Sequence, residues 1–316
     1  MRRWKKRQVG EGFTSGVLEY MEQLRSEGRY SSAKSYRDAL GSITRFLGKR
    51  SIAYRDITLS CLHRYQSYLL GQGRSWNTVS TYLRRVRHIY YRGVGKGAAP
   101  YVRRLFREVF TGVESRRKRA LSAAEMCRLM TARVDDPSLR RTQLSLSLMF
   151  LYGGMAFVDF AHLRPGDISE GCLEYRRQKT GTSLRLSLPE EAERLSSELS
   201  AGVLPGSAYL YPFLSGACEG EAAYREYLSA LARFNRDLRL LARAVGVTSP
   251  VSSYTIRHTF ATRLRELDVS IEVISELMGH KSIKTTQIYL RSFSLDRLSA
   301  ENTACFNSVY HNSAAG

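Results

Sequence analysis

Apolar residues recur at helical spacing through most of the first 110 residues. Four such stretches predict helices, at residues 11–26, 30–47, 57–71 and 76–93. A shorter basic stretch predicts a further helix at residues 101–109. Long helices joined by tight connections are typical of a small helical bundle. The pattern therefore predicts an N-terminal helical domain over residues 10–112.

The pattern changes after this domain. Residues 113–121 have no apolar face and predict a linker. Ser122, with Glu125 three residues later, forms a capping box that predicts a helix start and a second domain over residues 122–316. Two strand-like runs, near residues 172–178 and 183–188, meet at a Thr-Gly-Thr turn. Helices are expected around them, at residues 122–133, 138–153, 189–200, 221–245, 254–267, 271–278 and 283–290. The expected fold class is mainly α, with a helical N-terminal bundle and a mixed α/β C-terminal domain.

The basic charge is concentrated in the first part of the chain. The chain has 316 residues and a net charge of +20, and residues 1–120 hold 27 Lys and Arg against 8 Asp and Glu. Such a charge indicates an acidic polymer as partner, most often nucleic acid, rather than a merely soluble basic protein. The first domain is therefore expected to hold duplex DNA.

Cysteine usage and hydropathy exclude several other classes. The five cysteines are scattered without C-x-x-C spacing, which argues against a disulfide framework and against a zinc site. The first twelve residues have charge but no apolar stretch behind it, unlike a signal peptide. The most apolar segment, residues 144–158, is too short and contains two glycines, so no membrane span is expected. We expect a cytoplasmic protein without a membrane partner.

Hydroxyl, amide and basic side chains gather near the starts of the second and fourth predicted helices. Such groups suit contacts with phosphates and grooves. Ordinary capping and a solvated face explain the small polar residues equally well, so the DNA interpretation is favoured for the arginine cluster only. The predicted DNA-binding residues, one of them in the linker, are Lys34, Arg37, Asn77, Thr78, Thr81, Arg84, Arg85 and Arg117.

The last third of the chain contains an ordered set of chemically active residues. The segment Y-T-I-R-H contains Tyr254 and Arg257, which share a helix face because they are three residues apart. The segment L-M-G-H ends at His280, and T-T-Q-I-Y places Tyr289 nine residues further on. Arginine offers a permanently charged fork to phosphate oxygens, and a histidine adds a hydrogen bond.

This series resembles the signature of the tyrosine recombinase (phage-type integrase) family, which runs H-x-x-R-H, then L-G-H, then a Tyr after T-T. The resemblance extends to the helical N-terminal domain. It implies that Tyr289 attacks a DNA phosphate and forms a 3′-phosphotyrosyl link, while Arg257 and His280 hold the phosphate. Lys179, at the hairpin turn, matches the family's general acid. The resemblance implies no cofactor and no metal.

Two positions depart from the family pattern. The family has an Arg in T-G-x-R-x-x-E/D, where this chain reads G-G-M-A-F-V-D with Ala156 at the Arg position. Asp159 retains the acidic position, with an orienting role expected. Tyr254 stands where the family has His or Lys, and is retained as a candidate catalytic residue. Arg164 is the first candidate to replace the missing Arg, followed by Arg176 or Arg177. A branch of small invertases and mobile-element integrases looks similar here.

The resemblance also implies a C-shaped clamp on DNA and a homo-tetramer on two synapsed short sites. The short segment before the first helix favours a simple recombinase, with DNA inversion slightly ahead of mobile-element integration. The tail over residues 294–310 is expected to dock on a neighbouring subunit or to pack on its own domain. Two alternatives stay open, namely a catalytically decayed DNA-binding relative and a type IB topoisomerase-like enzyme. His258 is expected to pack within the site.

Overall fold

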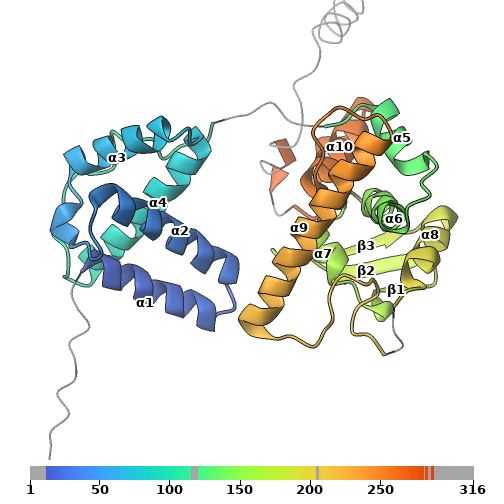
Figure 1. Ribbon diagram of the computed structural model, residues 1–316, viewed down its shortest axis with the longest axis horizontal. Helices are drawn as coiled ribbons and strands as arrows, with labels where there is room; N and C mark the ends of the chain where they lie inside the picture. The colour runs from blue at the N-terminus through green and yellow to red at the C-terminus, as the bar shows by residue number, and fades with distance from the viewer. Residues whose placement is uncertain (1–11, 115–119, 204–205, 281, 284–285, 288–316) are drawn as a thin grey trace, which may run out of the picture. The chain divides into compact units, whose positions relative to one another are not determined.

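The computed structural model describes residues 12–114, 120–203, 206–280, 282–283 and 286–287. The chain divides into two compact units, Met1–Arg116 and Arg117–Gly316, coloured blue to cyan and green to orange in Figure 1. The division falls inside the segment expected to be a linker. Within the described residues, no helix is long and apolar enough to cross a membrane.

The first unit is a helical bundle. Its elements are α1 (Phe13–Ser26), α2 (Tyr30–Leu47), the 3₁₀ turn η1 (Tyr54–Asp56), α3 (Leu59–Gly71) and α4 (Trp76–Gly95). Each long helix buries one apolar stripe, and α4 contributes Val79, Leu83, Val86 and Ile89 to the shared core. Thr58 and Ser75 start α3 and α4 by accepting hydrogen bonds from backbone N–H groups of the first turn.

The helix expected at residues 101–109 is wrong. This stretch forms turns, and Arg104 has a positive φ of 62°, which interrupts any right-handed helix. Leu105, Phe106 and Val109 are buried in the core of the first unit. Burial of these three side chains, rather than helix propensity, determines the path of this segment.

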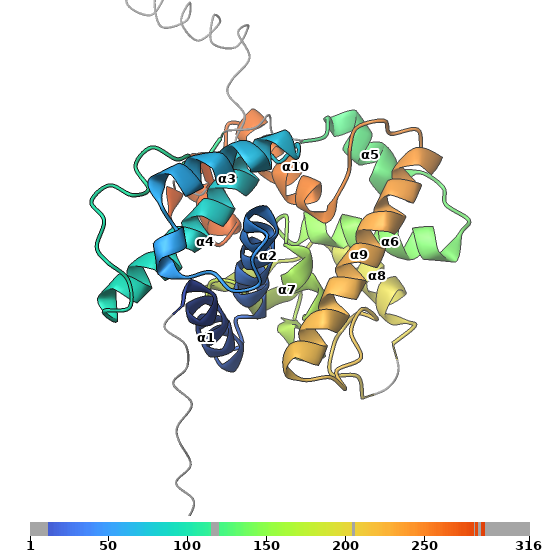
Figure 2. The same cartoon turned by 60° about the vertical axis from the view of Figure 1, so that its left-hand side comes forward.

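The second unit combines helices with one small sheet. Its elements are α5 (Ala123–Thr131), α6 (Pro137–Leu151), α7 (Phe157–Ala161), η2 (Pro165–Asp167), β1 (Ile168–Ser169), β2 (Cys172–Arg176), β3 (Ser183–Ser187), α8 (Glu190–Ser200), α9 (Gly220–Ala244), α10 (Ser253–Glu266) and α11 (Ile271–Leu277). The central helix is α6, which contacts α5, α8, α9 and α10 (Figures 1 and 2). The expected fold class is therefore confirmed.

The sheet is antiparallel with the strand order β1-β2-β3. The pair β2–β3 is the predicted hairpin, with Leu173 opposite Leu186 and Tyr175 opposite Leu184. The short elements β1 and α7 carry too few residues for a periodic pattern, and the sequence did not predict them. The capping box of Ser122 and Glu125 is present at the start of α5. Of the helix expected at 283–290, only residues 283, 286 and 287 are described, and they are helical.

Candidate active site

Arg257 is the centre of a buried polar cluster in the second unit. Its side chain comes from α10 and is only 2% exposed. Nη1 donates to the carbonyl oxygen of Gly154 (2.8 Å), and Nη2 donates to that of Met278 (2.5 Å). Nη2 also lies 3.1 Å from His280 Nε2. A guanidinium held at both ends in this way has a fixed orientation, which suits recognition of a tetrahedral anion.

The carbonyl groups that hold Arg257 depend on two glycine turns. Gly154 has a φ of +64°, and a Cβ there would lie 2.8 Å from Phe260 Cβ. Gly279 has a φ of +59°, and a Cβ there would lie 2.8 Å from the Cδ of Arg177. Only glycine fits both the backbone conformation and the space. The G-G and L-M-G-H segments of the sequence therefore form the frame of the cluster.

His280 follows the second turn and is half-buried. Its backbone N–H donates to Ser275 O (2.9 Å), and its Nδ1 lies 2.9 Å from the hydroxyl oxygen of Thr286. Burial, followed by the positive charges of Arg257, Arg177 and Lys179, lowers the pKa of His280 to about 4. The imidazole is therefore neutral at pH 7.

Arg177 joins the same cluster from the residue directly after β2. It is 7% exposed, and its Nη1 donates to the carbonyl oxygen of Gly279 (2.8 Å). Its Nε faces Asp159 Oδ2 at 3.5 Å, and Asp159 Oδ1 accepts a hydrogen bond from the backbone N–H of Gln178 (2.8 Å). Asp159 therefore orients the start of the hairpin turn. Arg177 and Arg257 are fixed on the consecutive carbonyl groups of Gly279 and Met278.

The other predicted active-site residues are more exposed than this cluster or differ from it in their contacts. Lys179 is exposed in the β2–β3 turn, close enough for its charge to act on His280. Tyr254 is 53% exposed at the start of α10, and its ring forms a T-shaped pair with that of His258 (ring centroids 4.6 Å apart). Arg164 is exposed before η2, and its backbone N–H, rather than its guanidinium, binds Asp167. Ala156 caps α7 and lies three residues before Asp159.

On α4, several predicted DNA-binding residues bind the chain itself. Asn77 donates to the Glu114 carbonyl (2.9 Å) and accepts from the Glu114 N–H (2.8 Å). Arg84 Nη2 donates to Gly112 O (2.8 Å), which also accepts from Ser80 (2.6 Å). These contacts attach the segment 112–114 to α4. The sequence contained no signal for them, because the partners are backbone groups more than 25 residues away.

The remaining predicted DNA-binding residues lie on the surface of the first unit or near it. Lys34 is exposed and pairs with Asp38 (2.7 Å), while Arg37 is exposed and 3.9 Å from the same carboxylate. Arg85 donates to Ser35 (3.0 Å) and lies over the ring of Tyr36. Thr78 and Thr81 serve the local structure of α4, as shown by contacts with Ser75 and with the carbonyl group of Asn77.

Some predicted residues lie outside the described residues. They are the nucleophile Tyr289, the linker residue Arg117 and the tail over residues 294–310.

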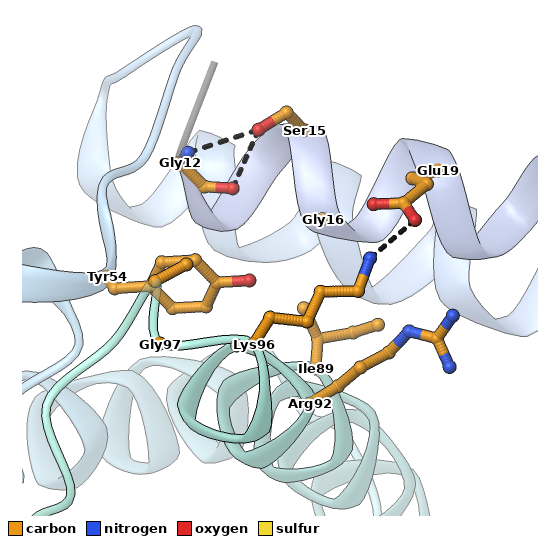
Figure 3. Close-up of a pocket in the computed structure, with 11 residues that line it drawn as sticks. Gly12, Ser15, Gly16, Glu19, Tyr54, Ile89, Arg92, Lys96 and Gly97 are labelled. Carbon is orange, nitrogen blue, oxygen red and sulfur yellow. Dashed lines mark hydrogen bonds and ion pairs between the residues drawn. The ribbon is translucent and has the colours of Figure 1, made fainter. Parts of the chain in front are cut away.

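A pocket in the first unit contains none of the predicted residues. It has a volume of about 270 Å³ and lies between α1, η1 and α4 (Figure 3). The Tyr54 side chain packs against glycines on both helices, since a Cβ at Gly16 would lie 2.5 Å from its hydroxyl oxygen and a Cβ at Gly93 would lie 2.4 Å from its ring. Across the opening, Lys96 pairs with Glu19 at 2.5 Å. Arg92, which also lines the pocket, donates to Gln23 Oε1 (2.8 Å), so both contacts join α1 to α4 or to the residue that follows it.

Solved structures share this fold. The Tn1549 transposon integrase in complex with a circular intermediate DNA matches with a TM-score of 0.66 and 15% identity, over 92% of this chain and 99% of that chain. A lambda integrase tetramer bound to a Holliday junction matches with a TM-score of 0.65 and 19% identity, over 89% of this chain and 79% of that chain.

Sequence relatives are tyrosine recombinases. XerD of Agrobacterium fabrum is 25% identical over 86% of this chain and 88% of its own length. XerA of Pyrococcus furiosus is 30% identical over 46% of this chain and 49% of its own length. The match to XerD of Lacticaseibacillus casei is 44% identical but spans only 18% of that relative.

Two family models match the chain, the phage integrase family over residues 119–295 and the phage integrase SAM-like domain over residues 13–101. The chain belongs to the phage integrase family and is an enzyme of the tyrosine recombinase class, whose reaction is the cleavage and transfer of DNA strands.

Proposed function

We propose that this chain is a site-specific DNA recombinase that cuts and rejoins duplex DNA through a 3′-phosphotyrosyl intermediate on Tyr289. The observation that carries the proposal is the fixed, buried guanidinium of Arg257 beside a neutral His280. Arg177 and Lys179 add positive charge around the same place, and the described part of the cluster contains one carboxylate, Asp159. Excess positive charge in a partly buried site favours binding of an anion such as a DNA phosphate.

The proposed reaction assigns a role to each group. The Tyr289 hydroxyl passes its proton to solvent water and forms a bond to phosphorus, while the bond from phosphorus to the 5′ oxygen breaks. Lys179 gives a proton to that oxygen, so the leaving group departs as a neutral hydroxyl. The guanidinium of Arg257 stabilises the charge that develops on the non-bridging oxygens. A 5′ hydroxyl from a second duplex reverses the step and completes the exchange.

We assign the role of the missing Arg at position 156 to Arg177 rather than to Arg164. Arg177 contacts Asp159, the acidic residue of the same motif, and shares the 278–280 turn with Arg257 and His280. Arg164 has an exposed side chain. Tyr254, half exposed on α10 and three residues before the buried Arg257, is proposed as a hydroxyl donor to the DNA phosphate.

The proposed partners are duplex DNA with short recombination sites and three further copies of this chain. Residues 1–120 carry nearly all the net positive charge, which supports a DNA-holding role for the N-terminal part of the chain. A lambda integrase with a similar fold forms a tetramer on a Holliday junction, and this supports a tetramer on two synapsed sites. Inversion and integration use the same strand exchange and differ in how the two sites are placed. With DNA as its substrate, the chain is proposed to work in the cytoplasm.

A nicked suicide duplex taken from the sequences that flank the gene tests the proposal. The expected result is an SDS-resistant protein–DNA adduct that is absent for Tyr289→Phe. DNA binding without an adduct would favour the decayed DNA-binding relative instead. Relaxation of a plasmid that lacks the target sequence would favour a type IB topoisomerase-like enzyme. Substrates with inverted, direct or separate sites then distinguish inversion from excision and integration.

A further inference from the structure

The hydroxyl group of Thr286 forms a contact that the proposed reaction does not yet use. Thr286 is fully buried, with 0% exposure, and its Oγ1 lies 2.9 Å from His280 Nδ1. In the sequence, Thr286 is three residues before Tyr289. A buried hydroxyl that binds an active-site histidine is therefore part of the short segment that carries the nucleophile.

The direction of the two hydrogen bonds on the imidazole follows from arginine chemistry. A guanidinium has donors and no acceptor, so the nitrogen of His280 that faces Arg257 Nη2 at 3.1 Å accepts. A neutral imidazole has one N–H, and that N–H is then on Nδ1. It donates to Thr286 Oγ1. Arg257 thereby sets the tautomer, and the hydroxyl of Thr286 stabilises it by accepting the hydrogen bond from Nδ1–H.

We propose that Thr286 is a positioning residue that stabilises the Nδ1–H tautomer of His280, so that Nε2 stays toward the guanidinium of Arg257, and that this contact ties the segment before Tyr289 to the phosphate-binding arginine. This inference rests on the proposed function for its effect on catalysis. The statement about the tautomer stands independently of that function. Without the hydroxyl, the imidazole loses this hydrogen bond from Nδ1–H, and the tautomer with Nε2 toward Arg257 becomes less stable.

The test uses Thr286→Val, which keeps the shape and removes the hydroxyl, and Thr286→Ser, which restores it. The full chain is assayed for single-turnover cleavage of the suicide duplex and separately for DNA affinity. We expect Thr286→Val to slow cleavage by about tenfold or more while DNA affinity changes little. Thr286→Ser should recover most of the rate. An unchanged rate for Thr286→Val, or no recovery with Ser, would overturn the role in positioning.

Thr262 provides a matched control. It is a buried threonine on α10, 4% exposed, and its hydroxyl has no hydrogen-bond partner among the described residues. Thr262→Val therefore removes a buried hydroxyl without removing this contact, and its cleavage rate should stay near that of the unchanged protein. Equal losses for the Thr262 and Thr286 variants would indicate a general effect of buried hydroxyls and would overturn the proposal.

Nitrogen NMR of histidine-labelled protein reads the tautomer directly and needs no activity. The signal of His280, assigned with His280→Asn, should show a protonated Nδ1 and an unprotonated Nε2 at pH 7, and Thr286→Val should change this pattern. A signal with the proton on Nε2 would overturn the inference. If the unchanged protein forms no adduct but shows the expected tautomer, the proposed function fails and the contact of Thr286 stands.

Discussion

Arg84 in the first unit and Arg257 in the second make similar hydrogen bonds, but the first fixes a chain segment and the second belongs to the candidate active site. Both guanidinium groups donate to a glycine carbonyl at 2.8 Å, Gly112 for Arg84 and Gly154 for Arg257. Arg84 also donates to the hydroxyl of Ser80, and these contacts attach segment 112–114 to α4. Around Arg257 lie His280 and the carbonyl group of Met278.

The comparison teaches that a hydrogen-bonded arginine is not by itself a sign of function. What distinguishes Arg257 is the concentration of like charges in a buried place, where burial and neighbouring cations lower the pKa of His280 to about 4. Groups arranged so that their charges repel one another are stabilised when an anion enters. The Arg84 contacts on α4 instead fix the path of the backbone over residues 112–114.

The largest expected effect concerns Arg177 and separates it from Arg164. Replacing Arg177 by Ala should lower the rate of suicide-duplex cleavage by about a hundredfold or more, because a buried donor near the developing charge is lost. Arg164→Ala, which removes an exposed side chain, should lower the rate by a much smaller factor. Single-turnover cleavage at saturating protein measures both. A larger loss of rate for Arg164→Ala than for Arg177→Ala would assign the role of the missing Arg to Arg164 instead of Arg177.

An effect of intermediate size follows from the pKa of His280. This pKa is about 4 in the folded protein and near 6.5 in an unfolded chain, so the unfolded state binds the proton first as the pH falls. The free energy of unfolding contributed by a neutral His280 is therefore complete above pH 6.5 and is lost progressively toward pH 4. Urea denaturation at pH 7 and at pH 5 should show a smaller loss for His280→Asn than for the unchanged protein.

Comparison with the variant also controls for His88, whose pKa is lowered by burial in the first unit and whose contribution is present in both proteins. Equal losses between pH 7 and pH 5 in the two proteins would contradict a buried neutral His280. A lowered pKa of His280 would then no longer distinguish the surroundings of Arg257 from those of Arg84.

The smallest effects concern the first unit and compare Asn77 with Arg37. Asn77→Ala removes both hydrogen bonds to Glu114 and should lower the free energy of unfolding by about 1 kcal/mol, with faster trypsin cleavage at the basic run near residues 116–119. Arg37→Ala removes an exposed charge and should leave stability unchanged. It should reduce the slope of log binding constant against log salt by about one.

Fluorescence anisotropy with duplex DNA at several salt concentrations, together with urea denaturation, measures both variants. A reduced salt slope for Asn77→Ala would show that this side chain also serves DNA. An unchanged slope for Arg37→Ala would remove Arg37 from the predicted DNA-binding residues.

Local patterns in the sequence were sufficient wherever neighbours in the chain determine the structure. The capping box of Ser122 and Glu125 and the β2–β3 hairpin depend on residues a few positions apart, and both were predicted. The stretch at 101–109 was predicted as a helix because of its composition, but burial of Leu105 and Phe106 in the core of the first unit prevails. Propensity is a weak preference that tertiary packing can override.

The sequence by itself determined the fold class, the family and the order of Arg257, His280 and Tyr289, because spacing along a helix and the chemistry of side chains are local properties. Only the tertiary structure placed Arg177 between Asp159 and the Gly279 carbonyl, joined Thr286 to His280, and turned Asn77 and Arg84 toward segment 112–114. The physical reason is that the partners in most of these contacts are far apart in the sequence. In the contact of Thr286 with His280, a turn whose conformation the sequence did not predict separates the two residues. Their partners become neighbours only after the cores have formed.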